Sequence, residues 1–177
     1  MRSATNHIQF CPSCGDPSVE PFKSVAVRCS ACGFELFFSP STSAAAFIEG
    51  PSGKLLVVKR KKEPRKGFFG LPGGFAAPNE TLEATLIREV KEEVNLDLVS
   101  WSFLGGWPNE YAYKSVVYSV MDTYFTAKVE NFDRLQSCQE ELESVHFVDP
   151  VTVDDEQWAF PSLKNAVEVY LSQRERF

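Results

Sequence analysis

The chain has 177 residues, 44% of them hydrophobic and 13% aromatic, so it has enough apolar side chains to build a real core. Its 18 basic and 24 acidic residues give a formal net charge of −6, which disfavours broad binding to nucleic acid or to anionic membranes. No stretch approaches the roughly 20 apolar residues that a membrane-spanning helix needs. The length exceeds one average domain only slightly, so we expect one compact domain with a small appended module.

The first pattern along the chain is a pair of cysteine knuckles, Cys11-Pro-Ser-Cys14 and Cys29-Ser-Ala-Cys32. They are separated by fourteen residues, one short of the usual spacing, and their four thiolates predict a tetrahedral structural Zn²⁺ site. Disulfide bonds are the alternative. Met1 to Phe10 is polar and holds no signal-peptide core, so we expect a reducing, cytoplasmic compartment, which favours zinc. Cys138 stands alone and is expected to be an ordinary thiol.

Alternation and turn residues predict the other elements. We expect a zinc ribbon in residues 1–39, with short strands at 25–28 and 34–38, and a second domain in residues 40–177 that follows a linker at 39–43. Residues 44–49 and 55–59 are expected to be strands around the hairpin turn Gly50-Pro51-Ser52-Gly53. Further strands are expected near 98–104, 115–127 and 145–148, and Pro161 and Ser162 open a final helix. Strands on both sides of one central helix predict an α+β fold.

Six basic residues crowd the segment before a glycine pair: Lys59, Arg60, Lys61, Lys62, Arg65 and Lys66. A charge run is often just a solvated loop. Next to a phosphate site, it would instead attract the phosphate. The sequence leaves both interpretations open.

The most informative stretch is Gly73-Gly74, followed by Glu80 and by Arg88-Glu89-Val90-Lys91-Glu92-Glu93-Val94-Asn95-Leu96. At about 100° per residue, Leu82, Leu86, Val90 and Val94 form one apolar arc, which predicts a helix. Thr81 is expected to cap the N-terminus of this helix. Asn95 tolerates the left-handed conformation and is expected to end it.

Three glutamates of this helix, Glu89, Glu92 and Glu93, stand at i, i+3 and i+4 and therefore share one face. Carboxylates so close repel one another, and a divalent cation that prefers hard oxygen ligands, Mg²⁺ or Mn²⁺, would resolve the repulsion. The alternative is a solvated acidic surface. Against it, Glu93 projects between Leu82 and Leu86 at the edge of the apolar arc, and the C-terminal half of a helix does not favour anions.

The run from Gly74 to Leu96 resembles the Nudix box, the signature of hydrolases that split nucleoside diphosphates linked to another moiety. It departs at one position, because the family usually has glycine where this chain has Asn95. The resemblance implies that Glu89, Glu92 and Glu93 bind Mg²⁺, that the carbonyl of Gly73 completes the metal shell, and that Arg88 and Glu80 fix the helix and the loop. It also implies an α/β/α sandwich with a mixed sheet.

The general base is not determined by the sequence. Glu92 or Glu93 could take a proton from the attacking water. In the family an additional acid often precedes the last strand, which makes Glu140, Glu141 and Glu143 candidates. A solvated acidic turn is the alternative for each of these three.

A zinc ribbon before such a box resembles the NADH pyrophosphatase branch. That branch carries a Pro-Trp-Pro-Phe-Pro segment after the box, where this chain keeps only Trp107-Pro108. NADH preference is therefore in doubt, and the predicted substrate is ADP-ribose or a related ADP-linked compound, with AMP among the products. The substrate-binding candidates are Arg65, Lys66, Gly74, Phe75, Trp107, Tyr111 and Tyr113. The last three could stack a base or equally pack in the core.

Other functions stay open. They are an NADH or NAD pyrophosphatase, including NAD-cap removal from RNA, a non-catalytic nucleotide sensor, and a nucleic-acid-binding module built on the ribbon. The full carboxylate set argues against a pure sensor. Between residues 8 and 38 the only basic residues are Lys23 and Arg28, too few for a strong phosphate footprint. We expect a small nucleotide as partner and no membrane, and a homodimer stays open.

Overall fold

The computed structural model describes residues 2–174, and the chain divides into two compact units. The ribbon unit contains the N-terminal residues up to Ser41 together with residues 110–120. The sheet unit contains residues 42–109 and the chain from Met121 onward. The sequence did not indicate that residues 110–120 group with the N-terminal residues, because nothing in their composition points to a distant partner.

The ribbon unit is built on a three-stranded antiparallel sheet of β2 (Val19–Phe22), β3 (Ala26–Cys29) and β4 (Glu35–Phe37). The strand β2 was missed, since Glu20 and Pro21 in a four-residue strand leave no alternating pattern. A 3₁₀ turn, η1 (Ala4–His7), follows the two-residue strand β1 (Arg2–Ser3), which pairs in parallel with Val116 and Val117.

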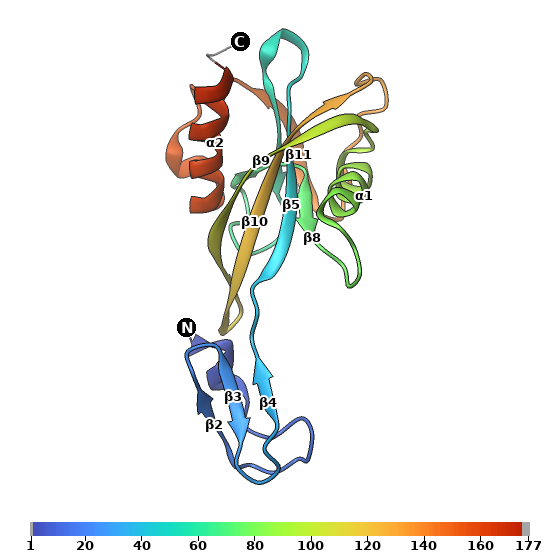
Figure 1. Cartoon of the computed structure of the whole chain (residues 1–177). Coiled ribbons are helices and arrows are strands. Elements are labelled where there is room, and N and C mark those ends of the chain that lie inside the picture. The colour runs from blue at the N-terminus through green and yellow to red at the C-terminus, as the bar shows by residue number, and fades with distance from the viewer. Residues whose placement is uncertain (1, 175–177) are drawn as a thin grey trace. The chain divides into compact units, whose positions relative to one another are not determined.

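The strands of the sheet unit form two sheets. One contains β5 (Ser41–Ile48), β8 (Gly73–Phe75), β9 (Leu98–Tyr113) and β10 (Val116–Val129), in which β10 lies next to β5, β5 next to β8, and β9 pairs with β10. The other contains β6 (Leu55–Arg60), β7 (Phe69–Gly70) and β11 (Leu142–Val148). The helices α1 (Leu82–Val94) and α2 (Pro161–Arg174) lie on opposite sides of the strands (Figure 1). This mixed α+β architecture between two helices confirms the predicted fold class.

The two helices cover two separate cores because β5 alternates. Ala44, Ala46 and Ile48 of β5 pack with the buried arc of α1, in which Leu86, Val90 and Val94 are fully enclosed. Phe47 points the other way, stacks on Tyr170 of α2 with ring centroids 4.6 Å apart, and joins the second core. Burying one such aliphatic or aromatic side chain is worth about 1.5–3 kcal/mol. The period of two in β5 therefore fixes which face carries α1.

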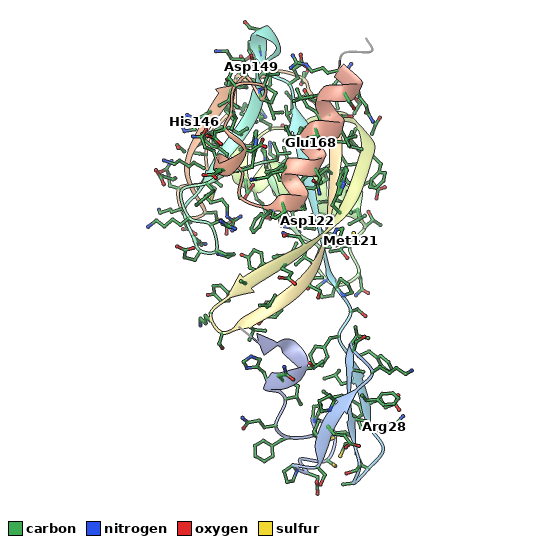
Figure 2. All side chains as sticks on the ribbon, turned by 90° about the vertical axis from the view of Figure 1, so that its left-hand side faces the viewer. Arg28, Met121, Asp122, His146, Asp149 and Glu168 are labelled. Atoms are coloured by element: carbon green, nitrogen blue, oxygen red, sulfur yellow. The ribbon has the colours of Figure 1, made fainter. Side chains whose placement is uncertain are left out.

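A buried carboxylate that the sequence did not reveal joins these elements. Asp122 of β10, 8% exposed, accepts hydrogen bonds from Ser43 Oγ (2.6 Å), Asn109 Nδ2 (2.8 Å) and Ser162 Oγ (2.6 Å). Figure 2 shows Asp122 beside the N-terminal end of α2. Three neutral donors compensate its burial, so it ties β5, β9, β10 and α2 together.

Several boundaries differ from expectation. The linker prediction is wrong for residues 41–43, which begin β5. The predicted hairpin turn at 50–53 contains a 3₁₀ turn, η2 (Pro51–Gly53). On either side of it, β5 and β6 meet only at the single bridge between Glu49 and Leu55 and then belong to different sheets. The strand β9 continues past residue 104 through a glycine pair and Pro108, since a strand that pairs along one side tolerates a proline. A short 3₁₀ turn, η3 (Asp155–Gln157), precedes α2. No helix within residues 2–174 combines the length and apolarity needed to cross a bilayer.

Candidate active site

The position of the glutamates depends on how α1 begins and ends. Thr81 Oγ1 accepts a hydrogen bond from the N–H of Ala84 at 3.2 Å, as expected of an N-cap. Asn95 adopts the left-handed conformation (φ 54°, ψ 34°), and its N–H donates to the carbonyl of Lys91. Both predicted caps are confirmed. They set the helix register and place Glu89, Glu92 and Glu93 in its last two turns.

Glu93 is the buried acid of the cluster. Its side chain is 8% exposed, and Oε2 accepts a hydrogen bond of 2.9 Å from the N–H of Gly73. Burial, together with the charges of Glu89 and Glu141, raises the pKa of Glu93 to about 8 against the opposing effect of the Gly73 N–H. A buried carboxyl with a raised pKa is costly to ionise, and a divalent metal would favour its charged form.

The glycine pair before the helix is required by close approach. A Cβ on Gly73 would lie 2.3 Å from the carbonyl oxygen of Ala44, and one on Gly74 would lie 2.5 Å from the carboxyl carbon of Glu89. Any larger residue would therefore push β8 away from β5 or displace Glu89. The backbone of β8 is held directly against two of the three glutamates.

Arg88 organises the other acids. Its Nε and Nη2 donate to the two oxygens of Glu80, both at 2.8 Å, in the bidentate geometry typical of strong Arg–carboxylate pairs. Its Nη1 donates to Glu89 at 2.7 Å and to Glu92 at 3.1 Å. Glu89 is largely covered, and burial raises its pKa although Arg88 opposes the shift, whereas the Glu92 side chain is 59% exposed. One guanidinium therefore contacts three carboxylates and places Glu89 beside Gly74.

Glu80 is fixed from three sides. Besides Arg88 it accepts hydrogen bonds from the N–H of Ala77 and from Thr85 Oγ1, both at 2.9 Å. The Arg88 hydrogen bonds and the Ala77 N–H lower the pKa of Glu80 to about 2. Glu80 thus acts on the loop and the helix, as the family resemblance implies.

We expect Glu80→Gln to lower stability at pH 7 and to do so less as the medium is acidified. Because the folded-state pKa lies near 2 and the ordinary value is 4.5, the contribution of Glu80 is complete above pH 4.5 and is lost as the pH falls toward 2. Denaturant midpoints of wild type and variant at pH 7 and pH 3.5 check this. Glu168→Gln, which alters an exposed carboxylate on α2 (Figure 2), is the control. If the midpoints of wild type and variant differ by the same amount at both pH values, the lowered pKa of Glu80 is contradicted.

Two further residues act on Glu93, and neither could be singled out from the sequence. The charge of Arg60 lowers the pKa of Glu93, and its guanidinium lies 5.2 Å from the ring centre of Phe160 while Nε donates to the carbonyl of Pro64. The charge of Glu141 raises the pKa of both Glu93 and Glu89. Of the three candidate acids, Glu140, Glu141 and Glu143, Glu141 is the one among the main causes of both pKa shifts. Spacing gave no signal for it, because residues 140, 141 and 143 are equivalent in sequence.

Three lysines of the basic segment contact the acidic turn before β11 or the beginning of that strand. Lys59 pairs with Glu143 at 3.0 Å, Lys62 with Glu141 at 3.5 Å, and Lys61 Nζ donates to the carbonyl of Gln139. Arg65 lies with its guanidinium 5.3 Å from the ring centre of Phe68, and Lys66 is exposed. In the described part of the chain, no interaction links Arg65 or Lys66 to the three glutamates.

The aromatic candidates divide between the two units. Trp107 packs in the second core with its ring centre 5.9 Å from that of Tyr124, which matches the core-packing interpretation. Tyr111 and Tyr113 belong to the ribbon unit. Phe75 is 42% exposed on β8, and its carbonyl accepts a hydrogen bond from Arg88 at 3.2 Å, so it lies at the glutamate cluster.

The four cysteines of the ribbon unit gather as a metal site requires. All four sulfur atoms lie within 4.8 Å of one another, with Cys11 and Cys32 at 3.7 Å and Cys14 and Cys29 at 3.7 Å. Burial raises the pKa of the Cys11 thiol, but the N–H groups of Cys14 and Ser13 outweigh it and lower the value to about 7. Thiolates held in this way could bind zinc. Cys138 lies elsewhere, and its N–H donates to the carbonyl of Glu93.

Comparison with known proteins gives consistent matches. The model of the NUDIX domain matches residues 40–167. The ADP-ribose pyrophosphatase of Methanocaldococcus jannaschii is 42% identical over 72 residues, 41% of this chain and 42% of that protein. The NAD-capped RNA hydrolase NudC of Deinococcus radiodurans is 33% identical over 105 residues, 56% of this chain and 37% of that protein. The matched segments span about two fifths of these relatives.

Solved structures show the same fold. A NUDIX hydrolase from Nitrosomonas europaea superimposes with a TM-score of 0.71 at 22% identity, covering 96% of this chain and 93% of that one. The NUDIX domain of Shewanella oneidensis NrtR, complexed with ADP ribose, gives a TM-score of 0.64 at 22% identity over 77% of this chain and 90% of that one.

Proposed function

The chain belongs to the NUDIX family, and we propose that it hydrolyses the diphosphate linkage of a nucleoside diphosphate derivative with the help of a divalent metal. The best substrate candidate is ADP-ribose or a related ADP-linked compound, with AMP as one product. One observation carries this proposal. Glu93 is a buried carboxyl whose pKa is raised to about 8, held by the N–H of Gly73 beside two further glutamates that Arg88 orients.

The donor set suits Mg²⁺ or Mn²⁺. Glu89, Glu92 and Glu93 would supply carboxylate oxygens, and the carbonyl of Gly73 is a further candidate. When bound, the metal would neutralise diphosphate oxygens and lower the pKa of a coordinated water. The protein supplies the geometry, because the Gly73 N–H fixes one oxygen of Glu93 and Arg88 fixes Glu89.

Two residues complete the proposed site. Glu141 acts electrostatically on both Glu89 and Glu93, and we assign it as the general base that takes the proton of the attacking water. Arg60 is the cation whose charge reaches Glu93 from the end of β6. It is therefore a better candidate for contact with the substrate phosphates than Arg65 or Lys66.

The proposed setting follows from the remaining chemistry. Cys11, Cys14, Cys29 and Cys32 would hold a structural Zn²⁺. Thiolates of this kind persist in a reducing compartment, and we propose a cytoplasmic location. The proposed partners are a small nucleotide and a second copy of the chain.

A substrate panel tests the proposed function. Purified protein is incubated with ADP-ribose, NADH, NAD, a diadenosine polyphosphate and NAD-capped RNA, with Mg²⁺ and in parallel with EDTA, and AMP release is followed. We expect metal-dependent AMP release that is fastest with ADP-ribose. Faster cleavage of NAD-capped RNA would favour the substrate named for the NudC relatives, and faster cleavage of NADH would favour an NADH pyrophosphatase. No hydrolysis of any compound, with nucleotide binding retained, would indicate a sensor.

A further inference from the structure

A cavity lies between the C-terminal half of α2 and the strands that this helix covers, on the side of the sheet unit opposite α1 (Figure 1). Its volume of about 460 Å³ falls within the roughly 300–1,000 Å³ that is typical of small-molecule sites. Its lining comes from α2, β9, β10 and the end of β5. The proposed hydrolysis uses none of these residues, so the cavity has no role in the site described above.

The cavity is separate from the glutamate cluster. Phe47 and Glu49 line it, and Phe47 belongs to the core under α2, whereas the cluster lies on α1. Ala45 pairs with Gly73, whose N–H holds Glu93. Glu49 follows four residues later, about 13 Å along the chain at roughly 3.3 Å per strand residue. A ligand in this cavity would therefore leave the cluster accessible to a diphosphate.

The most deeply buried residues of the lining are apolar or aromatic. Phe47 is 1% exposed, and its ring stacks on that of Tyr170 with the planes 18° apart. Ala127 is buried beside them. Ser100 and Thr126 add hydroxyl residues to the lining. An apolar interior with a few polar groups is typical of sites for organic molecules rather than for free inorganic ions.

The charged residues of the lining leave a positive charge uncompensated. Both oxygens of Glu49 are occupied, because Oε1 accepts a hydrogen bond from Arg174 at 3.2 Å and Oε2 accepts one from Tyr170 at 3.3 Å. Lys128 is exposed, and within the described residues 2–174 it takes part in no ion pair. The C-terminal end of α2 disfavours an anion, but Arg174 in its last turn opposes that effect. Lys128 therefore favours an anionic group at the cavity.

We propose that this cavity is a second ligand site, which binds a small organic phosphate with a partly apolar body, of the kind found in a nucleoside monophosphate. Lys128 would hold the phosphate, and Gln173 and the hydroxyl residues offer further donors. A phosphate has three acceptor oxygens and nearly two negative charges, so it suits these donors better than a carboxylate does. The body of the ligand would lie against Tyr170 and Ala127. The inference does not depend on the proposed function, because it requires binding and no reaction.

Binding is tested with the full chain as purified and without added Mg²⁺. AMP is the probe in calorimetric titrations, adenosine and inorganic phosphate are the comparisons, and shifts of backbone amide resonances locate the bound AMP. We expect AMP to bind more tightly than either comparison and to shift the amides of residues 100–102 and 126–128. Shifts confined to residues 73–75 and 89–93 would place AMP at the glutamate cluster and overturn the proposal. Equal affinity for adenosine, or no AMP binding at about 1 mM, also overturns it. Turnover is not measured, so failure of the proposed hydrolysis would leave this result unaffected.

Three variants make the binding test specific. Lys128→Gln removes the uncompensated charge and is expected to weaken AMP binding at least about tenfold, since hydrogen bonds to charged groups are among the strong ones. Ser100→Phe fills the cavity without changing its charge and is expected to abolish binding. Lys164→Gln removes the same charge from α2 outside the cavity and is expected to bind AMP as wild type does. Melting temperatures show that each variant is folded. A folded Lys128→Gln with unchanged AMP affinity overturns the proposal.

Discussion

Replacing Glu93 by glutamine is expected to reduce turnover at saturating Mg²⁺ at least about a hundredfold, since metal charge stabilisation is worth several kcal/mol and each 1.4 kcal/mol is tenfold. Glutamine keeps the shape of the side chain and can still accept the Gly73 N–H, so the helix and β8 stay in place. Only the charge that would bind the metal is lost. Steady-state AMP release at several Mg²⁺ concentrations measures the effect.

Stability provides an independent readout for the same variant. Because the pKa of Glu93 is raised to about 8 from 4.5, ionising it costs the metal-free protein stability as the pH rises through that window. The variant has no such group and is therefore expected to melt at the same temperature or higher than wild type at pH 8 in EDTA. A variant that is inactive because it is unfolded would melt lower.

Neighbouring glutamates serve as controls. Glu83→Gln changes an exposed carboxylate in the first turn of the same helix and is expected to keep full turnover. Glu141→Gln is expected to lower turnover, whereas Glu140→Gln, one residue away, is expected to leave turnover unchanged. Unchanged turnover in the Glu93 variant would discard its assigned role, and equal effects at positions 140 and 141 would discard the proposed base.

Local signals predicted α1 and its acids well because every determinant lies within one short stretch. The Thr81 cap, the apolar arc from Leu82 to Val94 and the Asn95 terminus are set by residues three or four apart. The same register made Glu93 face the core edge, and its low exposure agrees with that expectation. The two cysteine pairs were similarly visible, because each spans only four residues, and their four sulfur atoms do gather in the structure.

Contacts between distant segments could not be predicted. Whether Glu141 or Glu140 reaches the cluster depends on how the turn before β11 folds, which one sequence does not encode as a pattern. Arg60 looked like any other member of its basic segment until β6 placed it near Glu93. Trp107 carried an aromatic signal that suits a base or a core equally, and only packing against Tyr124 distinguishes them.

Removing zinc is expected to unfold the ribbon unit, the largest effect on stability that we predict. The described residues of this unit bury few apolar side chains deeply, among them Ala26 and Val27, whereas Phe10, Val25 and Phe37 are at least half exposed. So small a core cannot offset the conformational entropy of about 50 residues, at roughly 1–2 kcal/mol each for the backbone. Structural zinc supplies about 10–16 kcal/mol in zinc-finger peptides, so we expect the fold of this unit to depend on the zinc proposed here.

Two cysteine variants make the zinc test specific. Cys32→Ser removes one of the four gathered thiolates and is expected to lose bound zinc and the amide protection of β3 and β4. Cys138→Ser, at the half-buried thiol outside the cluster, is expected to keep one zinc per chain. Zinc content and hydrogen exchange with and without chelator measure both. If the metal holds β3 in place, its removal must speed amide exchange there. A chelated protein whose β3 amides exchange as slowly as before would therefore reject the structural site.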